Sequence, residues 1–259
     1  VCKDIKAGDI IMAIDGQKIE AGIDYYPMLA GKAGKATRLG IKGEKKEIVV
    51  RPISWGKQEE LLYKRWVRRN EHMVDSLSGG RIAYVHIEAM DAASFHEFYK
   101  NLLSEKNRMR DAVIVDTRHN GGGWLHNDVC IALSGKAYSR YTPRGKFIGN
   151  DPFDRWVKPS CMLVCEDNYS NAHGTPWLYK EMGIGKLIGA PVPGTMTAVW
   201  WENIGQYTFG IPQVGTRDNR DNYLENQQLN PDIECYVTPE NMLRGVDTQI
   251  ETAVKEMMK

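Results

Sequence analysis

The segment at 161–176, CMLVCEDNYSNAHGTP, is the sequence feature that most constrains the fold. Met162–Cys165 is a short continuous apolar run, which is typical of a buried strand. The polar segment Glu166–Asn171 follows at once, and we expect a helix over 177–184 that ends at glycines. A strand, a tight turn and a helix in this order form an elbow that lifts one side chain clear of the sheet. Backbone N–H groups at the helix start point at that side chain, and in acyl-transfer enzymes the nucleophile occupies this position.

Strands and helices alternate through the rest of the chain after the glycine pair at 79–80. The expected strands are 81–87, 112–115, 162–165 and 186–189, and the expected helices are 91–108, 124–135 and 247–258. An irregular insertion at 136–160, aromatic-rich β structure at 199–212 and a polar loop at 217–228 complete the pattern. Asp91 is expected to cap the first of these helices. This alternation predicts an α/β domain with a largely parallel sheet over 79–259.

Residues 1–54 have a different character. Asp15-Gly16 between apolar runs predicts a hairpin, a helical stretch is expected at 24–34, and two alternating strands follow at 36–42 and 46–53. The order resembles the latter part of a PDZ domain, without its opening strand and carboxylate-binding loop. PDZ domains bind extended chain ends by adding a strand to a sheet edge. The alternative is a small β domain with only a packing role.

Residues 55–78 are predicted to form a linker helix, since apolar residues recur in it at close to helical spacing. Its basic cluster, Lys64-Arg65 and Arg68-Arg69, is interpreted as a solvated helix face. The whole chain has 34 basic and 33 acidic residues, so charge gives no reason to expect nucleic-acid or anionic-membrane binding. No apolar run approaches the roughly 18 residues of a membrane span. Because the chain opens at Val1 without a Met, we expect a fragment of a longer protein.

The five cysteines are Cys2, Cys130, Cys161, Cys165 and Cys235. Cys161 and Cys165 would lie about 13 Å apart along one strand, too far for a disulfide. Buried free thiols are expected, and no metal or cofactor is predicted, because no further ligands stand at metal-site spacing.

Three glycines at 121–123 come directly after a predicted buried strand and before a helix. Their N–H groups can converge on an anion, because glycine tolerates positive φ and close backbone approach. An oxyanion hole and a simple tight turn both fit. A nucleotide loop does not, since no Lys-Ser/Thr pair and no G-x-G-x-x-G are present.

Four motifs occur in order: DTRHNGGG, the elbow, KEMGIGKLIGAPVPGT and ENQQLNPDIE. Together with the PDZ-like segment, they resemble the tricorn branch of the C-terminal-processing serine peptidases. The resemblance implies a ClpP/crotonase-like core over 79–259. It also implies hydrolysis of peptide bonds through an acyl-enzyme, formed by a Ser-His-Ser-Glu tetrad.

The resemblance carries over to individual residues unevenly. Gly122 and Gly123 match the oxyanion-hole glycines, and Glu225 matches the acidic member of the tetrad, with an exposed loop acid as the alternative for Glu225. Ala172 falls where the nucleophilic serine should stand, and a methyl group cannot attack a carbonyl. His173 falls where the second oxyanion N–H donor would be. The family's base histidine and its partner serine belong to a segment before the PDZ domain, which this chain does not contain.

Residues nearby could take over the missing roles. Ser170 lies two positions before Ala172 and is the alternative nucleophile if the elbow has a different register. Its other interpretation is a turn hydroxyl that bonds the local backbone. His173 could then be its base, although residues i and i+3 across an elbow seldom align. His86 is expected to be a packed strand histidine, and His119 and His126 to line the cleft or cap locally.

Two explanations of Ala172 remain, a designed Ser→Ala change and a natural loss of the nucleophile. The neighbours Asn171 and His173 also differ from the family motif, which favours the second explanation. The first functional hypothesis is therefore a tricorn-like serine peptidase fragment, inactive as it stands. The second is a peptide-binding pseudopeptidase, and a third, from fold analogy alone, is acyl-CoA chemistry. The resemblance also implies peptide or unfolded polypeptide substrates, a homo-oligomer in full-length form, and a cytoplasmic location, with the periplasm as the alternative.

Overall fold

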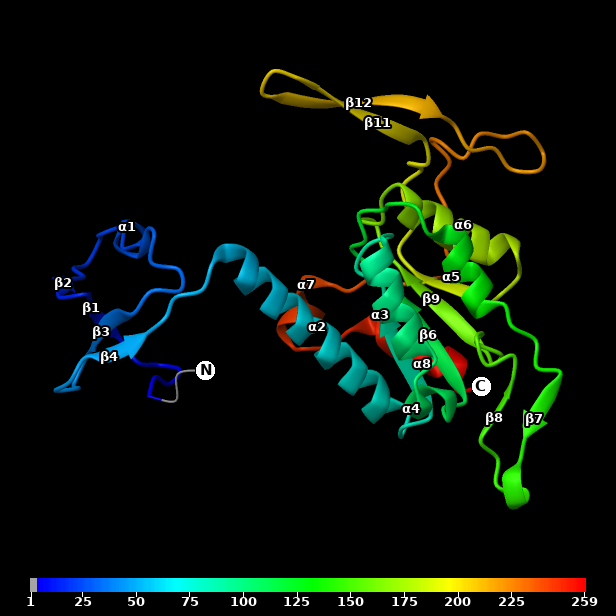
Figure 1. The fold of residues 1–259 in the computed structure, drawn as a ribbon, viewed down its shortest axis with the longest axis horizontal. Coiled ribbons are helices and arrows are strands. Elements are labelled where there is room, and N and C mark those ends of the chain that lie inside the picture. Colours follow the sequence, from blue (N-terminus) through cyan, green and yellow to red (C-terminus); the bar gives the residue numbers. More distant parts are fainter. Residues whose placement is uncertain (1–3) are drawn as a thin grey trace. The chain divides into compact units, whose positions relative to one another are not determined.

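The structure is a computed structural model that describes residues 4–259 (Figure 1). The chain divides into two compact units, Val1–Trp66 and Val67–Lys259. Helix α2 (Trp55–Leu77) contains the division, so the predicted linker helix is confirmed as a helix.

The first unit is a small antiparallel sheet with strand order β2-β1-β3-β4. Its strands are β1 (Ile11–Ile14), β2 (Gln17–Lys18), β3 (Thr37–Ile41) and β4 (Ile48–Val50). Asp15 and Gly16 both have positive φ, 48° and 81°, which confirms the predicted hairpin turn. Helix α1 (Tyr26–Leu29) is a single turn, shorter than the helical stretch expected at 24–34. Ile14, Met28, Leu39 and Ile41 form the core of this unit.

The second unit is built on a five-stranded sheet with order β13-β10-β9-β6-β5, in which every pair of neighbours is parallel. The strands are β5 (Ile82–His86), β6 (Ala112–Asp116), β9 (Ser160–Val164), β10 (Lys186–Gly189) and β13 (Ile233–Glu234). The α/β class and the parallel sheet predicted from the sequence are therefore confirmed. Strands β6 and β9 are fully buried and contain almost no polar side chains, as expected for central strands covered on both faces.

Helices cover both faces of this sheet (Figure 1). One face packs against α3 (Ala92–Leu102), α5 (His126–Leu133) and α6 (Asn171–Glu181). The other packs against α8 (Thr248–Met257) and the later residues of α2, through Val74. Two apolar clusters on opposite faces of one sheet thus form the core of the unit.

Two helices of the second unit differ from their predicted bounds by six residues at one end. The helix expected over 91–108 ends at Leu102, and Ser104 caps a new short helix, α4 (Glu105–Arg108), by accepting the N–H of Asn107. Asp91 caps α3 as predicted, accepting the N–H of Ser94 at 2.8 Å. Helix α6 begins at Asn171, six residues before the expected start, and therefore contains Pro176 in its interior.

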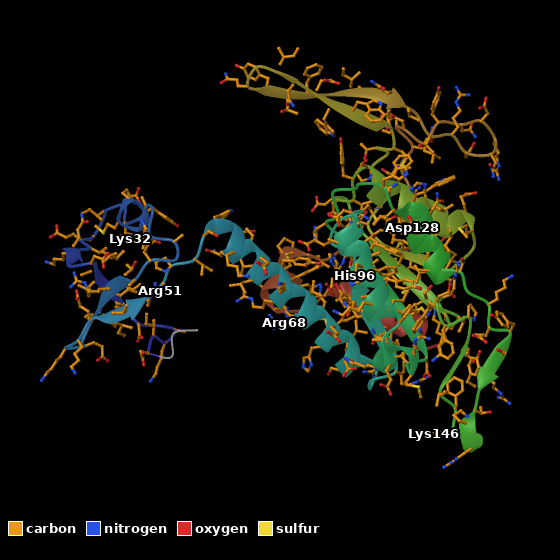
Figure 2. All side chains as sticks on the ribbon, viewed as in Figure 1. Lys32, Arg51, Arg68, His96, Asp128 and Lys146 are labelled. Carbon is orange, nitrogen blue, oxygen red and sulfur yellow. The ribbon has the colours of Figure 1, made fainter. Side chains whose placement is uncertain are left out.

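The remaining segments form small elements. The insertion at 136–160 contains a short hairpin, β7 (Ser139–Tyr141) and β8 (Gly149–Asp151), joined through η1 (Pro143–Gly145). Strands β11 (Ala198–Ile204) and β12 (Tyr207–Val214) pair as a two-stranded ribbon, and most of its side chains are exposed (Figure 2). Helix α7 (Pro239–Leu243) precedes α8. Within residues 4–259, the helices are all too short or too polar to cross a bilayer.

Candidate active site

The candidate site lies at the carboxyl ends of β6 and β9, which are hydrogen-bonded neighbours in the sheet. The chain leaves β6 into the triglycine segment 121–123 and leaves β9 into the elbow. Because parallel strands all end at one edge of a sheet, these two loops meet there. The N–H of Tyr169 in the elbow donates to the carbonyl of Asn120 at 3.0 Å, which joins the loops directly.

The sharp turn of the elbow lies at Ser170. Its backbone has φ 54° and ψ −121°, and α6 begins at the next residue. A non-glycine residue in this region is strained, and such strain persists only where surrounding contacts hold it. Here the N–H of Ser170 donates to Thr195 Oγ1 at 3.2 Å. The Ser170 hydroxyl does not cap the helix and bonds no other residue in the described part of the chain, so no structural task occupies it.

Gly122 packs against this turn. A β-carbon on Gly122 would stand 2.7 Å from both Ser170 Cβ and the carbonyl oxygen of Tyr169, and the φ of Gly122 is +94°. The N–H of Gly122 donates to Asn120 Oδ1 at 2.8 Å, while Asn120 Nδ2 donates to the carbonyl of Ile87. The site therefore requires glycine at 122, and the Asn120 side chain fixes its position.

Two backbone N–H groups beside Ser170 have no acceptor among residues 4–259, those of Asn171 and Gly123. The N–H of Asn171 is 3.0 Å from the point where a β-carbon on Gly122 would stand, so the helix start and the glycine loop are adjacent. The N–H of His173 donates to the carbonyl of Ser170 at 2.8 Å and is used inside the helix.

The Asn171 side chain clamps the start of α5. Its Oδ1 accepts the N–H groups of Leu125 at 2.8 Å and His126 at 3.1 Å, and its Nδ2 lies 2.8 Å from His126 Nδ1. The amide donates there, so Nδ1 of His126 is the acceptor nitrogen. Burial lowers the pKa of His126. His126 thus helps hold the glycine loop to α6.

Glu225 approaches the elbow through the segment 195–197. One carboxylate oxygen, Oε2, accepts from Met196 N at 2.7 Å, Thr197 N at 2.8 Å and Thr197 Oγ1 at 2.9 Å. Burial acts to raise the pKa of Glu225, but these hydrogen bonds outweigh it and hold the pKa below its usual 4.5. Glu225 is therefore an ionised, anchored side chain rather than a free loop acid.

Ala172 and His173 both point into the protein. Ala172 is fully buried within the core cluster beneath the elbow. His173 is 1% exposed and its Nδ1 has no hydrogen-bond partner among the described residues. Burial lowers the pKa of His173, and the nearby charge of Glu225 opposes this. His173 also lines a hollow of about 290 Å³, whose other walls come from Trp177 and the segment 218–229.

Residues 81–235, more than half of the chain, match the family model described as Peptidase family S41. The chain belongs to peptidase family S41. Residues 3–54 match a second model, described as Tricorn protease PDZ domain. The resemblance to tricorn-like peptidases that the motifs predicted is thus confirmed.

Relatives of this S41 chain are tricorn proteases. It is 26% identical to the tricorn protease of Thermoplasma acidophilum over 97% of the chain and 24% of that protein. It is 28% identical to tricorn protease homolog 1 of Streptomyces coelicolor, over 96% of the chain and 24% of the relative. A crystal structure of the tricorn protease superposes with TM-score 0.82 and 26% identity, covering 97% of the chain and 25% of the other. The S41 chain therefore spans about a quarter of the length of these relatives.

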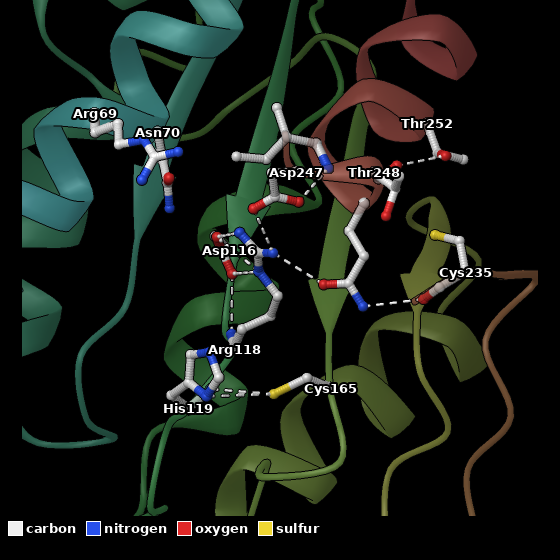
Figure 3. Close-up of polar contacts among 12 residues, drawn as sticks. Arg69, Asn70, Asp116, Arg118, His119, Cys165, Cys235, Asp247, Thr248 and Thr252 are labelled. Carbon is white, nitrogen blue, oxygen red and sulfur yellow. Dashed lines mark hydrogen bonds and ion pairs between the residues drawn. The ribbon is translucent and has the colours of Figure 1, made fainter. Parts of the chain in front are cut away.

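A buried polar network lies behind the site, at the end of β6 (Figure 3). Arg118 donates to both carboxylate oxygens of Asp116 and, through Nη1, to Asp247 and Gln249, each at 2.9 Å. Burial would raise the pKa of Asp116, but the charge and hydrogen bonds of Arg118 hold it below its usual value. The Tyr84 hydroxyl also donates to Asp116, at 2.8 Å. This network ties the start of α8 to the strand that carries the glycine loop.

Two further histidines, His86 and His119, make contacts near the ends of β5 and β6. His86 Nε2 lies 3.1 Å from the carbonyl of Arg118, and burial lowers the pKa of His86. His119 lies beside Cys165 and Asp167, and the Cys165 side chain, together with Asp167, raises its pKa to about 9. Cys130, Cys161, Cys165 and Cys235 are free thiols, as predicted, and Cys2 lies outside the described residues.

Sequence reasoning missed three parts of this site. Thr195, with Met196 and Thr197, positions Ser170 and Glu225, and the only signal for it was the G-T-M-T run after β10. Asn171 acts as a clamp on α5, which no local pattern indicates. His119 and Cys165 are 46 residues apart in the sequence, and they come into contact because β6 and β9 are neighbours in the sheet.

Proposed function

We propose that this chain carries the nucleophile, the oxyanion hole and the acidic residue of a tricorn-like serine peptidase, with Ser170 as the nucleophile. The observation that carries the proposal is the Ser170 turn. A strained serine follows a buried parallel strand, begins a helix and keeps its hydroxyl free of structural bonds. This is the geometry of a nucleophile elbow, in which strain exposes the attacking oxygen.

In the proposed reaction, Ser170 Oγ attacks the carbonyl carbon of a peptide bond, and negative charge develops on the carbonyl oxygen. The free N–H groups of Asn171 and Gly123 are suited to donate to that oxygen, so we assign them the oxyanion hole. Gly122 serves the site by its close approach to Ser170, and its own N–H is bound to Asn120. The base takes the Ser170 proton and gives it to the leaving nitrogen as the C–N bond breaks, which releases the amine product and leaves the acyl-enzyme. Water then attacks the ester, which releases the acid product and restores the Ser170 hydroxyl.

Ala172 takes no chemical part in this proposal, because its methyl group is buried under the elbow. If Ser170 is the attacking residue, the motif alignment that puts Ala172 at the nucleophile position is shifted by two residues. His173 is likewise not assigned the second oxyanion role, since its N–H is bound to the Ser170 carbonyl. Glu225 keeps its proposed place in the tetrad, anchored 2.7 Å from Met196 N.

The general base is assigned to a histidine outside residues 1–259. Ser170 Oγ has no hydrogen bond to a histidine within the described residues, and the resemblance to the family implies a base in a segment before the PDZ domain. The same proposal includes peptide substrates, a homo-oligomeric state and a ClpP/crotonase-like core. The likeness to a tricorn crystal structure supports them, as does the all-parallel sheet covered on both faces.

The test is fluorophosphonate labelling of the full-length protein, followed by peptide mapping. We expect one labelled serine, Ser170, and loss of labelling in Ser170→Ala. Ser134→Ala is the matched control, because Ser134 lies at the end of α5 and its hydroxyl donates to the carbonyl of Ile131. Absence of labelling in wild-type protein that binds peptides would favour the pseudopeptidase alternative instead.

A further inference from the structure

A cluster of three possible metal ligands lies beside the elbow, outside the groups assigned to catalysis. His119 follows β6, while Cys165 and Asp167 follow β9. Figure 3 shows His119 beside Cys165. His119 Nδ1 is 2.8 Å from Asp167 Oδ2 and 3.9 Å from Cys165 Sγ. All three ligand atoms lie within 4.8 Å of one another. An imidazole, a thiol and a carboxylate therefore converge on one point.

We propose that His119, Cys165 and Asp167 bind a divalent metal ion of the zinc class. Around tetrahedral zinc, with bonds of about 2.0–2.3 Å, neighbouring ligand atoms stand roughly 3.3–3.8 Å apart. The two separations from His119 Nδ1, 2.8 Å and 3.9 Å, lie on either side of that range, and the third pair of ligand atoms lies within 4.8 Å. The proposal concerns metal binding and stands independently of the assignment of Ser170.

The geometry around His119 favours a shared ion over a catalytic relay. In a Cys-His-Asp relay, the thiol and the carboxylate contact different ring nitrogens. Here both approach the same nitrogen, Nδ1. A single cation placed among the three groups satisfies all of them at once, whereas one proton on Nδ1 serves only one acceptor well.

The Cys165 thiol donates to Asn168 Oδ1 at 3.4 Å, a weak bond that a metal ion would replace when it binds the thiolate. Cys165 Sγ accepts the backbone N–H of His119 at 3.3 Å, and such N–H···S bonds stabilise a thiolate ligand. Cys165 is 4% exposed, whereas the side chains of His119 and Asp167 are 57% and 65% exposed. An ion can therefore enter from solvent and meet a buried sulfur at the base of the site.

The ligand set defines the class of ion. Thiolate and imidazole ligands select zinc and similar transition metals, while magnesium and calcium require mainly oxygen ligands. Three protein ligands leave a fourth position for water. The bound ion would cross-link the two loops that meet at Ser170, because His119 lies just before the triglycine segment and Cys165 just before the elbow.

The test uses cobalt as a spectroscopic substitute for zinc in the full-length protein. We expect one equivalent of Co²⁺ to produce a near-ultraviolet thiolate-to-cobalt band that Zn²⁺ removes and Mg²⁺ does not. Cys165→Ser should abolish the band, and His119→Asn and Asp167→Asn should each weaken binding by at least about 10-fold. Asparagine suits position 119, whose φ is 62°, and Asp167 is exposed, so both variants should fold.

Two matched controls complete the experiment. Cys235→Ser removes another free thiol that lies outside the cluster, and Asp128→Asn removes an exposed carboxylate on α5. Both should bind Co²⁺ as wild type does. A wild-type protein without the band would overturn the proposal. So would a band that survives in Cys165→Ser, or His119→Asn and Asp167→Asn variants that both bind with unchanged affinity.

Discussion

Gly122 and Ser170 approach so closely that a β-carbon on Gly122 would stand 2.7 Å from Ser170 Cβ. Gly122→Ala must therefore move the elbow and also place alanine at a φ of +94°. We expect the labelling rate of Ser170 to fall at least about 100-fold and the free energy of unfolding to fall by about 1–3 kcal/mol. Fluorophosphonate kinetics and urea unfolding measure the two effects.

Gly121→Ala is the control for this change. Nothing lies within 4 Å of a β-carbon at that position, and its φ is not in the left-handed region. Labelling and stability should remain near those of wild type. Equal losses in both variants would show that the triglycine segment is merely intolerant of side chains and that contact with Ser170 is not what matters.

Glu225 gives a prediction about pH. Its pKa in the folded protein is lower than in the unfolded chain, where it is near 4.5. The stabilisation that it contributes is therefore fully present above about pH 4.5 and is lost as the pH falls through the folded-state pKa. Glu225→Gln should lower the free energy of unfolding by about 1–2 kcal/mol at pH 7, where the carboxylate is charged and accepts three hydrogen bonds.

The comparison that checks this is urea unfolding of both proteins at pH 7 and at pH 3. The difference between wild type and Glu225→Gln should shrink at the lower pH, because protonation of Glu225 removes the same interaction. A difference that stays constant between the two pH values would contradict the lowered pKa.

Arg118 is expected to be essential for stability, because it neutralises the fully buried carboxylate of Asp116. Arg118→Met leaves that charge without its partner, and we expect a loss of about 3–5 kcal/mol in urea unfolding. The double variant Arg118→Met with Asp116→Asn removes both charges and should recover part of the loss. A double variant that is less stable than the sum of the single changes would show that the network is not held by this charge pair.

Asn171→Ala should weaken the clamp between α6 and α5, because the N–H groups of Leu125 and His126 lose their acceptor. We expect a loss of about 1–3 kcal/mol in unfolding free energy. Asn171→Asp keeps both acceptors and adds a charge beside His126, so it should raise the pKa of His126 relative to wild type. NMR titration of the His126 ring follows that pKa, and a pKa that did not rise would contradict the contact.

The sequence was sufficient for much of the fold, because the central strands are continuous apolar runs and glycines mark their ends. It predicted the strand, the turn and the helix of the elbow. Matching the motif letters aligned Ala172 with the nucleophile, whereas our proposal of Ser170 rests on backbone strain and burial, which the letters do not contain. The His119 and Cys165 contact depends on which strands are neighbours, and spacing along the chain contains no information about that order.

Pro176 explains why the sequence predicts that α6 begins later than it does in the structure. Proline lacks the N–H that would donate to the carbonyl of Ala172, four residues earlier, so its position suggests a helix that begins later. In the structure, Asn168 Nδ2 donates to that carbonyl at 3.0 Å and replaces the missing bond. Asn168 also bonds Thr117 Oγ1 and the N–H of Cys165.

This replacement predicts coupling between Asn168 and Pro176. Asn168→Ala leaves the buried carbonyl of Ala172 without a donor, and we expect a loss of about 2–4 kcal/mol in urea unfolding. Pro176→Ala restores an N–H at the right position in the helix. The double variant should therefore be more stable than the sum of the two single changes by about 1–2 kcal/mol.

Asn107→Ala, at another buried asparagine, is the control and should combine additively with Pro176→Ala. Asn107 bonds Asn101 and Ser104 and shares neither of these partners with Pro176. Additivity in both pairs would mean that Asn168 does not replace the bond that Pro176 removes.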